Sequence, residues 1–273
     1  MRIYQDNPGF QIALNAPICP QLLRDDAIVI NEDGWYRTIT PSSPWAADDN
    51  EILFSNLDKQ DADGKIETII GEYRKLGRPF RWCVYPWTQP AYLGERFLKR
   101  GATCSDVKAL LCDTSLPLEL VEGTEIEQVD PNSTEAYEAY IEFMSSGIMS
   151  SGRILPANEV AFRHRRYREL ITGPKAIMQL FIARYDGVIA GCGAMYIKED
   201  SAWLTGDYIA SAFEGRGLFQ SLIAARLRAL RNMGIPIAVG HGREQTSVPW
   251  LERFGFKSIY SYRIYQFDPV VAG

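Results

Sequence analysis

The stretch 210–219, ASAFEGRGLF, constrains the fold of this chain more than any other segment. It joins an alternating apolar run that ends at 208–210 to a long amphipathic run over 218–233. Alternation predicts a strand and the amphipathic run predicts a helix, so the segment between them is a short loop at a helix start. Gly215 and Gly217 lack the Cβ atoms that would hold a ligand away from the backbone. The segment therefore predicts close contact between main chain and ligand.

An anion fits such a loop best. The first amides of a helix have no partner within the helix, and the helix dipole is positive at that end, so a phosphate is favoured there. The glycine spacing matches neither the nucleotide P-loop nor the dinucleotide-binding fingerprint. Gly-x-Gly before a helix also occurs as a plain turn, and that interpretation stays open at this point.

Composition narrows the possible partners. The chain has 273 residues, 46% of them hydrophobic, and a net charge of −5. The length suits one large domain or two smaller ones with a sizeable core. The acidic balance argues against a broad nucleic-acid or anionic-membrane surface and leaves room for a local basic pocket. We expect no nucleic-acid partner and no membrane partner.

Cysteine and histidine usage indicates a reduced compartment. Five cysteines are widely spread without C-x-x-C spacing, and there are only two histidines, so we expect no metal site. No run approaches the ~20 apolar residues that span a bilayer. The first twenty residues lack the pattern of a signal peptide. Together these features predict a cytoplasmic, metal-free protein.

The first half has the pattern of a mixed α/β unit. Alternating residues around Asp33-Gly34 predict a hairpin. Helical spacing over 66–76 and a start at Pro90 predict two helices. The expected order is strand, strand, strand, helix, strand, helix, strand, and the last strand covers 106–112. We expect the aromatic residues Trp82, Tyr85 and Trp87 to be core or interdomain packing rather than a ligand-stacking surface.

The second half begins after a proline-containing connector at 114–118, where we place a domain boundary. Its expected elements are listed in chain order: strand 120–129, helix from 133, helix 157–171, strands 177–185, 188–197 and 203–210, helix 218–231, strand 235–240, helix 247–254 and strand 258–267. The arginine-rich helix 157–171 either faces solvent or helps to bind an acidic ligand. We expect Arg226, Arg228 and Arg231 to point to solvent or to a phosphate.

On these motifs the chain resembles the GNAT superfamily of N-acetyltransferases over about 114–268. The first motif is the pyrophosphate loop, Q/R-x-x-G-x-G/A, at 214–219, and the second is a last helix ending in Gly-Phe, SVPWLERFGF at 247–256. The segment RPFRWCVYPWTQPAYLGERFLKRGA is similar to the first half of tandem GNAT-like proteins. The resemblance implies an incomplete GNAT-like domain over 1–115 and a complete one over 116–273. It also implies an α/β (α+β) fold with a mixed, mostly antiparallel sheet flanked by helices.

The resemblance further implies acetyl-CoA as co-substrate. In the family, loop amides hold the diphosphate, and the preceding strand pairs with the pantetheine arm and steadies the thioester oxygen. The matching cofactor-binding positions are Tyr208, Ile209, Ala210, Glu214, Gly215, Arg216, Gly217, Leu218 and Phe219. The implied reaction is direct transfer of acetyl to the primary amine of a small molecule, without an acyl-enzyme. The implied protein is a monomer or homodimer.

Three positions depart from the family pattern. Glu214 is an acid where glutamine or arginine is usual, Phe219 is large where a small residue is usual, and Leu251 stands at the position of the usual tyrosine acid. These departures favour an alternative, a catalytically silent module that binds CoA or a protein partner. Glu214 is compatible with binding if it turns outward, and Phe219 interferes only if it points into the loop.

Catalytic groups must then come from elsewhere. Asp207 and His241 lie where a base or its relay water belongs, and histidine titrates near neutral pH. Tyr260 is the candidate acid, with Tyr262 and Tyr208 as substitutes. A structural acceptor role for Asp207 and an idle loop position for His241 stay open, and Glu244 is a further candidate base. The acceptor amine, the acyl chain length and the role of the first half do not follow from the sequence.

Overall fold

The computed structural model describes residues 8–32, 34–44, 49–146, 155–173 and 176–268. Its strands form one eleven-stranded sheet in the order β1-β2-β3-β4-β11-β5-β10-β9-β8-β7-β6. The strands are β1 (Ile28–Glu32), β2 (Trp35–Ile39), β3 (Glu51–Phe54), β4 (Phe80–Val84), β5 (Thr103–Asp113), β6 (Thr124–Gln128), β7 (Met178–Tyr185), β8 (Val188–Ile197), β9 (Ser201–Ile209), β10 (Ile237–Arg243) and β11 (Lys257–Phe267). The helices are α2 (Pro8–Asn15), α3 (Ala62–Leu76), α4 (Leu93–Leu98), α5 (Thr134–Ser145), α6 (Ala157–Ile171), α7 (Leu218–Asn232) and α8 (Val248–Arg253), with short 3-10 turns η1 (Pro20–Leu22) and η2 (Ser211–Phe213).

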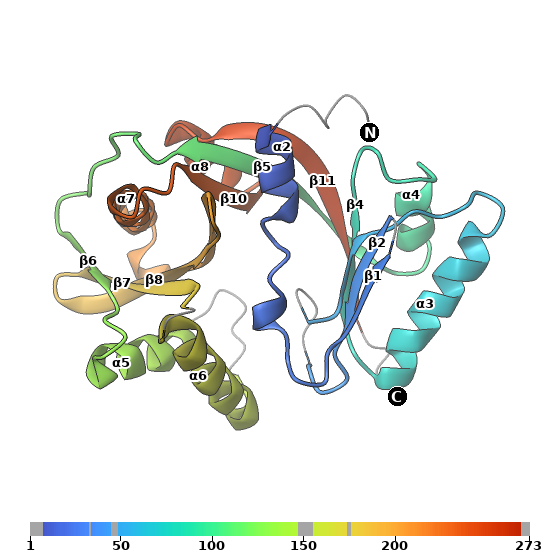
Figure 1. Ribbon diagram of the computed structural model, residues 1–273, viewed down its shortest axis with the longest axis horizontal. Helices are drawn as coiled ribbons and strands as arrows, with labels where there is room; N and C mark the ends of the chain where they lie inside the picture. Colours follow the sequence, from blue (N-terminus) through green and yellow to red (C-terminus); the bar gives the residue numbers. More distant parts are fainter. Residues whose placement is uncertain (1–7, 33, 45–48, 147–154, 174–175, 269–273) are drawn as a thin grey trace.

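The two halves of the chain repeat one pattern. In the first half, β3 leads through α3 to the parallel strand β4, and α4 then leads to β5. In the second half, β9 leads through α7 to the parallel strand β10, and α8 then leads to β11. A parallel pair requires such a crossover helix, so each half contains the same βαβ-type unit. Figure 1 shows the units at opposite ends of the molecule.

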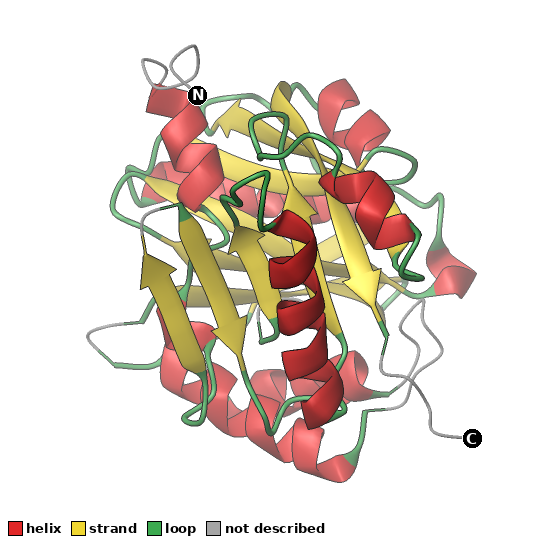
Figure 2. Ribbon diagram, turned by 90° about the vertical axis from the view of Figure 1, so that its right-hand side faces the viewer, coloured by secondary structure: helices red, strands yellow, loops and turns green. Residues whose placement is uncertain are grey.

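The two halves exchange their last strands. β11, from the second half, lies between β4 and β5, while β5, from the first half, lies between β11 and β10. The long antiparallel ladder between β5 and β11 fills the centre of the sheet, which runs unbroken through both halves (Figure 2). The sequence boundary at 115/116 falls just after β5 and stays a prediction.

Helices cover both sides of the sheet, and alternation along each strand divides its side chains between them. We call the side covered by α2, α5 and α6 the inner face; it carries the largest hydrophobic cluster. α7 and α8 cover the other side in the second half, where a second cluster forms. A third cluster lies under α3 and α4 in the first half, with Trp82 fully buried in it, as packing was expected to require.

Most expected elements are present with bounds shifted by a few residues. Ser133 caps α5 by accepting a hydrogen bond from the Ala136 amide, and Gly77 ends α3 in the left-handed region at φ 61°. Two predictions are wrong in their bounds. The helix expected at Pro90 begins at Leu93, and the strand expected over 120–129 covers only Thr124–Gln128. In the second case residues before Thr124 instead pack against α7, as Val121 shows by hydrogen bonding to Ser221.

Two further features were missed or wrong. α2 was not predicted, because eight residues are too few for a clear period. Arg226 was expected at solvent or at a phosphate, but its side chain is fully buried beneath the sheet. Its guanidinium donates to a carboxylate and to two backbone carbonyls. A buried charge is tolerated only when it is paired and hydrogen-bonded in this way.

Candidate functional site

The parallel strands β9 and β10 separate halfway along their length. They pair from Ile237↔Ser201 to Gly240↔Leu204 and no further. Beyond that point, β9 stays with β8 through Gly191↔Ile209, and β10 stays with β5 through Arg243↔Val107. The facing backbone edges of residues 205–209 and 241–243 therefore lack a strand partner in each other. Such open edges can add an extended ligand by main-chain hydrogen bonds.

A bulge in β9 marks the start of this separation. Its register with β8 shifts between Cys192 and Ala194, and Gly206 has φ +65°, which only glycine adopts without strain. The Ala210 amide donates to the Ala190 carbonyl of β8 at 2.8 Å. Successive strand residues direct their backbone groups to opposite sides, so the Ile209 amide points toward the gap. Of the three strand positions expected at the cofactor, Ile209 is the one whose backbone amide faces the gap between β9 and β10.

The glycine loop lies directly after the separated end of β9 and before α7. Gly215 has φ +76° and Gly217, the N-cap of α7, has φ +79°. Across the part of the chain that the structure describes, none of the amides of residues 215–219 donates to a protein acceptor. Five unsatisfied donors at the positive end of a 15-residue helix form an anion site.

The side chains that depart from the family pattern leave the loop open. Phe219 packs against Phe254 of α8 with ring centroids 5.9 Å apart, so it points away from the loop. Glu214 is exposed. Arg216 lies over the ring of Tyr185, with Cζ 4.8 Å from the centroid. A cation held beside the loop offsets the charge of Glu214.

The connector after β5 supports the loop from below. The Val121 amide donates to Ser221 Oγ at 2.9 Å, and Thr124 and Ser221 share a hydrogen bond of 2.7 Å. A Cβ at Gly217 would lie within 2.7 Å of three Val121 carbons. Gly217 is thus required both by its positive φ and by close packing, whereas a Cβ at Gly215 would meet nothing within 4 Å.

Asp207 lies at the bulge but faces α7 rather than the inner face. Its carboxylate pairs with Arg226, with Oδ2 3.2 Å from Nη1 and a second, shorter contact from Nη2 to Oδ1. Burial raises the pKa of Asp207, and the Arg226 charge acts against that rise. These contacts favour the structural acceptor role over that of a base on the other side of the sheet.

His241 faces the inner side of β10, where both ring nitrogens are engaged. Nε2 lies 3.0 Å from the Ala13 carbonyl of α2, and Nδ1 lies 2.9 Å from the Tyr262 hydroxyl. A carbonyl only accepts, so Nε2 carries the proton and Nδ1 accepts from Tyr262. Burial lowers the pKa of His241 to about 4, and the Arg81 charge adds to the lowering, while the bond to Ala13 opposes it. At neutral pH the ring is therefore uncharged, and access to Nδ1 requires Tyr262 to move.

The tyrosines of the site divide into bonded and unbonded hydroxyls. Tyr260 and Tyr208 each have a buried hydroxyl without a hydrogen-bond partner among the described residues. Burial raises the pKa of both, so both are protonated at neutral pH. Tyr208 lies on the separated part of β9, close enough to Glu214 for that charge to contribute to its raised pKa. Leu251 is buried in the cluster under α8, so that helix contributes no acid at this position.

The arginine-rich helix α6 is neither wholly solvated nor part of the loop site. Arg166 pairs with Asp25 at 3.0 Å and donates to the Leu23 carbonyl at 3.0 Å. Arg24 in turn pairs with the buried Glu159 of α6 at 2.6 Å. Only Arg165 is largely exposed, at 62% of its side chain. Arg166 thus joins the second half to the first, whereas Arg168 donates to the Pro131 carbonyl within the second half.

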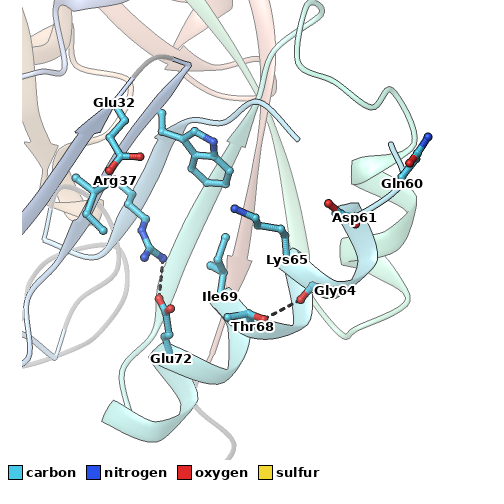
Figure 3. Close-up of a pocket in the computed structure, with 11 residues that line it drawn as sticks. Glu32, Arg37, Gln60, Asp61, Gly64, Lys65, Thr68, Ile69 and Glu72 are labelled. Carbon is cyan, nitrogen blue, oxygen red and sulfur yellow. Dashed lines mark hydrogen bonds and ion pairs between the residues drawn. The ribbon is translucent and has the colours of Figure 1, made fainter. Parts of the chain in front are cut away.

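A separate cavity of about 600 Å³ lies between β1, β2 and α3 (Figure 3). Its ionic groups partly pair, with Arg37 and Glu72 at 2.7 Å. None of the site residues expected from the sequence lines it. It lies at the β1 edge of the sheet, whereas the glycine loop follows β9 in the other half.

The described residues form neither a metal-binding cluster nor a membrane-spanning helix. Those residues hold no group of three or more histidine, cysteine, aspartate or glutamate side chains placed to bind a metal ion. Nor does any helix in them have the length and apolar character needed to cross a membrane.

The site thus consists of a sheet whose parallel pair β9 and β10 separates, followed by a glycine loop at the start of α7. Residues 150–256 match the model of the acetyltransferase (GNAT) family, so the chain contains a GNAT acetyltransferase domain. No curated protein sequence matches the chain.

Solved structures share the whole fold at low identity. A conserved protein of unknown function from Staphylococcus epidermidis has a TM-score of 0.66 at 11% identity, with 90% of this chain and 96% of that chain covered. A GCN5-related N-acetyltransferase from Kribbella flavida has a TM-score of 0.62 at 15% identity, with 97% of each chain covered. A tandem GNAT protein from the clavulanic acid biosynthesis pathway has a TM-score of 0.55 at 13% identity, with 91% and 85% covered. The repeated halves fit this tandem architecture.

Sequence reasoning missed several polar groups on the inner face. Tyr85 and Trp203 each have a buried polar atom without a partner among the described residues, as Tyr260 does. Tyr85 follows a strand of the first half and Trp203 lies in β9, so only the strand exchange brings them to one face. No spacing rule connects residues that far apart in sequence.

Proposed function

We propose that this protein is an acetyl-CoA-dependent N-acetyltransferase that acts on the primary amine of a small molecule. The observation that carries the proposal is the row of unpartnered amides at 215–219 beside the open backbone edge of β9. A diphosphate suits the amides, and an extended amide-containing arm suits the edge. Coenzyme A joins these two groups in one molecule.

Residues of this chain provide for the rest of the reaction. The amine nitrogen forms a bond to the acetyl carbon as the carbon–sulfur bond breaks, and the leaving sulfur takes a proton. The Ile209 amide points into the gap, where it can donate to an oxygen that gains negative charge. Tyr208, on the same strand, has an unionised hydroxyl without a partner among the described residues and is our candidate proton donor.

The amine must lose a proton before or during attack. Asp207 is held by Arg226 on the far face, and Nδ1 of His241 already accepts from Tyr262. Neither is placed as a free base, so we propose that the amine binds in its neutral form or loses its proton to water. Monomer or homodimer, no nucleic acid and no membrane remain our expectations for partners.

A matched pair of variants tests the cofactor site. Gly215→Asp adds a negative charge where a side chain has open space, and Gly215→Asn adds the same shape without charge; both residues tolerate positive φ. By calorimetry we expect acetyl-CoA to bind the wild type and Gly215→Asn, and to bind Gly215→Asp at least tenfold more weakly. Equal affinity for all three would place the phosphates elsewhere.

The second candidate function is a module that binds CoA without turnover. Buried Leu251 at the usual acid position favours it. Thiol release measured with acetyl-CoA and a panel of amines separates the two, since binding without release across the panel supports the module.

A further inference from the structure

The inner face holds a group of buried polar atoms that have no hydrogen-bond partner among the described residues. They are Tyr85 Oη, Trp203 Nε1 and Tyr260 Oη, and their residues are only 3%, 8% and 6% exposed. A buried polar group without a partner costs about 1–3 kcal/mol. Three such atoms on one face call for a ligand that supplies the missing partners.

Ring contacts connect these residues into one cluster. Tyr260 lies 5.9 Å from Tyr85 and 6.4 Å from His241, and His241 lies 6.3 Å from Trp203, all between ring centroids. Ala109 of β5 pairs with Tyr260 on one side and with His241 on the other.

Formal charge is absent from the cluster itself. Glu51 and Arg81, the nearest ionic pair in β3 and β4, are joined at 2.6 Å and 3.1 Å. His241 is neutral because burial lowers its pKa to about 4. What the cluster offers is ring surface, two hydroxyls that donate or accept, and an indole N–H that only donates. A carboxylate or a second ammonium finds no counter-charge there.

α2 covers this cluster from the first half. Phe10 packs on Tyr260 and Trp87 at 5.4 Å and 5.0 Å between centroids, and the Ala13 carbonyl accepts from His241. Lys198, directly after β8, donates to the Asn15 and Ile18 carbonyls at the end of the helix. α2 lies against β5, β10 and β11 (Figure 1), so both halves of the chain contribute to the cluster and its cover.

We propose that this cluster is the acceptor subsite and that it takes an amine on a multiply hydroxylated, otherwise uncharged ring, the chemistry of an amino sugar. The C–H face of such a ring packs on aromatic rings, and its hydroxyls meet Trp203, Tyr260 and Tyr85. The inference rests on the proposed acetyltransferase function for its reaction, but binding of the acceptor does not depend on acetyl-CoA. Entry requires α2 to shift, because the three atoms are closed to solvent.

The test compares two amines of the same ring size on the full chain without acetyl-CoA. Glucosamine carries ring hydroxyls and cyclohexylamine carries none. By calorimetry we expect glucosamine to bind at least tenfold more tightly than cyclohexylamine, lysine or spermidine. Tyr260→Phe removes the hydroxyl and keeps the ring, and Trp203→Phe replaces the indole by a smaller ring without an N–H donor. Each is expected to weaken glucosamine binding at least tenfold while acetyl-CoA affinity stays unchanged.

Tyr73→Phe is the control variant. Its hydroxyl donates to the Thr38 carbonyl at 2.7 Å, so its loss lowers the melting temperature and leaves glucosamine affinity unchanged. Tyr260→Phe removes an unsatisfied group, so its melting temperature stays level or rises. Equal affinity for glucosamine and cyclohexylamine, tighter binding of lysine or spermidine, or wild-type affinity in both site variants overturns the subsite. If the wild type binds glucosamine as expected but does not bind acetyl-CoA, the acetyltransferase proposal is contradicted and the subsite is not.

Discussion

Arg226 of α7 reaches up to the bulge of β9 and holds Asp207 by two contacts, one of them 3.2 Å between Nη1 and Oδ2. Its Nη1 also donates to the Ala194 carbonyl at 3.0 Å, opposite that bulge in β8. The pair therefore ties the helix that carries the glycine loop to the point where β9 leaves β10. The pair thus has a structural role in holding the site's geometry.

Removing one partner of this pair is expected to be costly. Asp207→Ala leaves a buried guanidinium without its carboxylate, and we expect a loss of about 3–5 kcal/mol in the free energy of unfolding, measured in urea. Asp207→Asn with Arg226→Met removes both charges and recovers most of that loss. If Asp207 were the base, the double variant would be stable yet inactive at every pH.

His241 predicts a stability change with pH. Its pKa is about 4 in the folded protein and near 6.5 when unfolded, so the unfolded state binds a proton first. The contribution of neutral His241 is complete above pH 6.5 and falls as pH drops toward 4. Urea unfolding at pH 7 and pH 5 measures it. We expect His241→Gln to lose less stability than the wild type over that interval; parallel losses would mean that His241 is not protected from protonation.

A second change at Val121 should partly restore a variant in which Gly217 is replaced. Gly217→Ala forces a Cβ against Val121 and places alanine at φ +79°, so both clash and strain destabilise the loop. Val121→Gly in the same chain removes all three clashing carbons and leaves the strain of about 1 kcal/mol. Thermal unfolding and acetyl-CoA calorimetry should both show partial recovery. No recovery would indicate that the strain alone disables the loop.

Replacing Tyr208 should slow the chemical step without weakening acetyl-CoA binding. Tyr208→Phe keeps the ring and removes the proton donor, so we expect kcat to fall by about 10²-fold or more with the KM for acetyl-CoA little changed. Tyr137→Phe is the control, since its hydroxyl bonds the His164 carbonyl between α5 and α6. Unchanged kcat in Tyr208→Phe would assign the proton to another group.

Sequence and structure agree where local rules decide. Glycine spacing and strand alternation were enough to predict a loop within 210–219 and the order of elements around it. The fully buried Arg226 escaped prediction because helical periodicity ranks arginine as a surface residue, and its partner Asp207 is in a different element. The inner-face cluster escaped because Tyr85 and Trp203 meet only through long-range strand pairing.

The exchange of β5 and β11 has a consequence for how the protein is made. Synthesis proceeds from the N-terminus, and β11 is the last strand to appear, ending at Phe267. Until then β4 has no neighbour on one side and β5 lacks the longest ladder in the sheet. Neither half can complete its part of the sheet before β11 has been synthesised, so the two halves finish folding together.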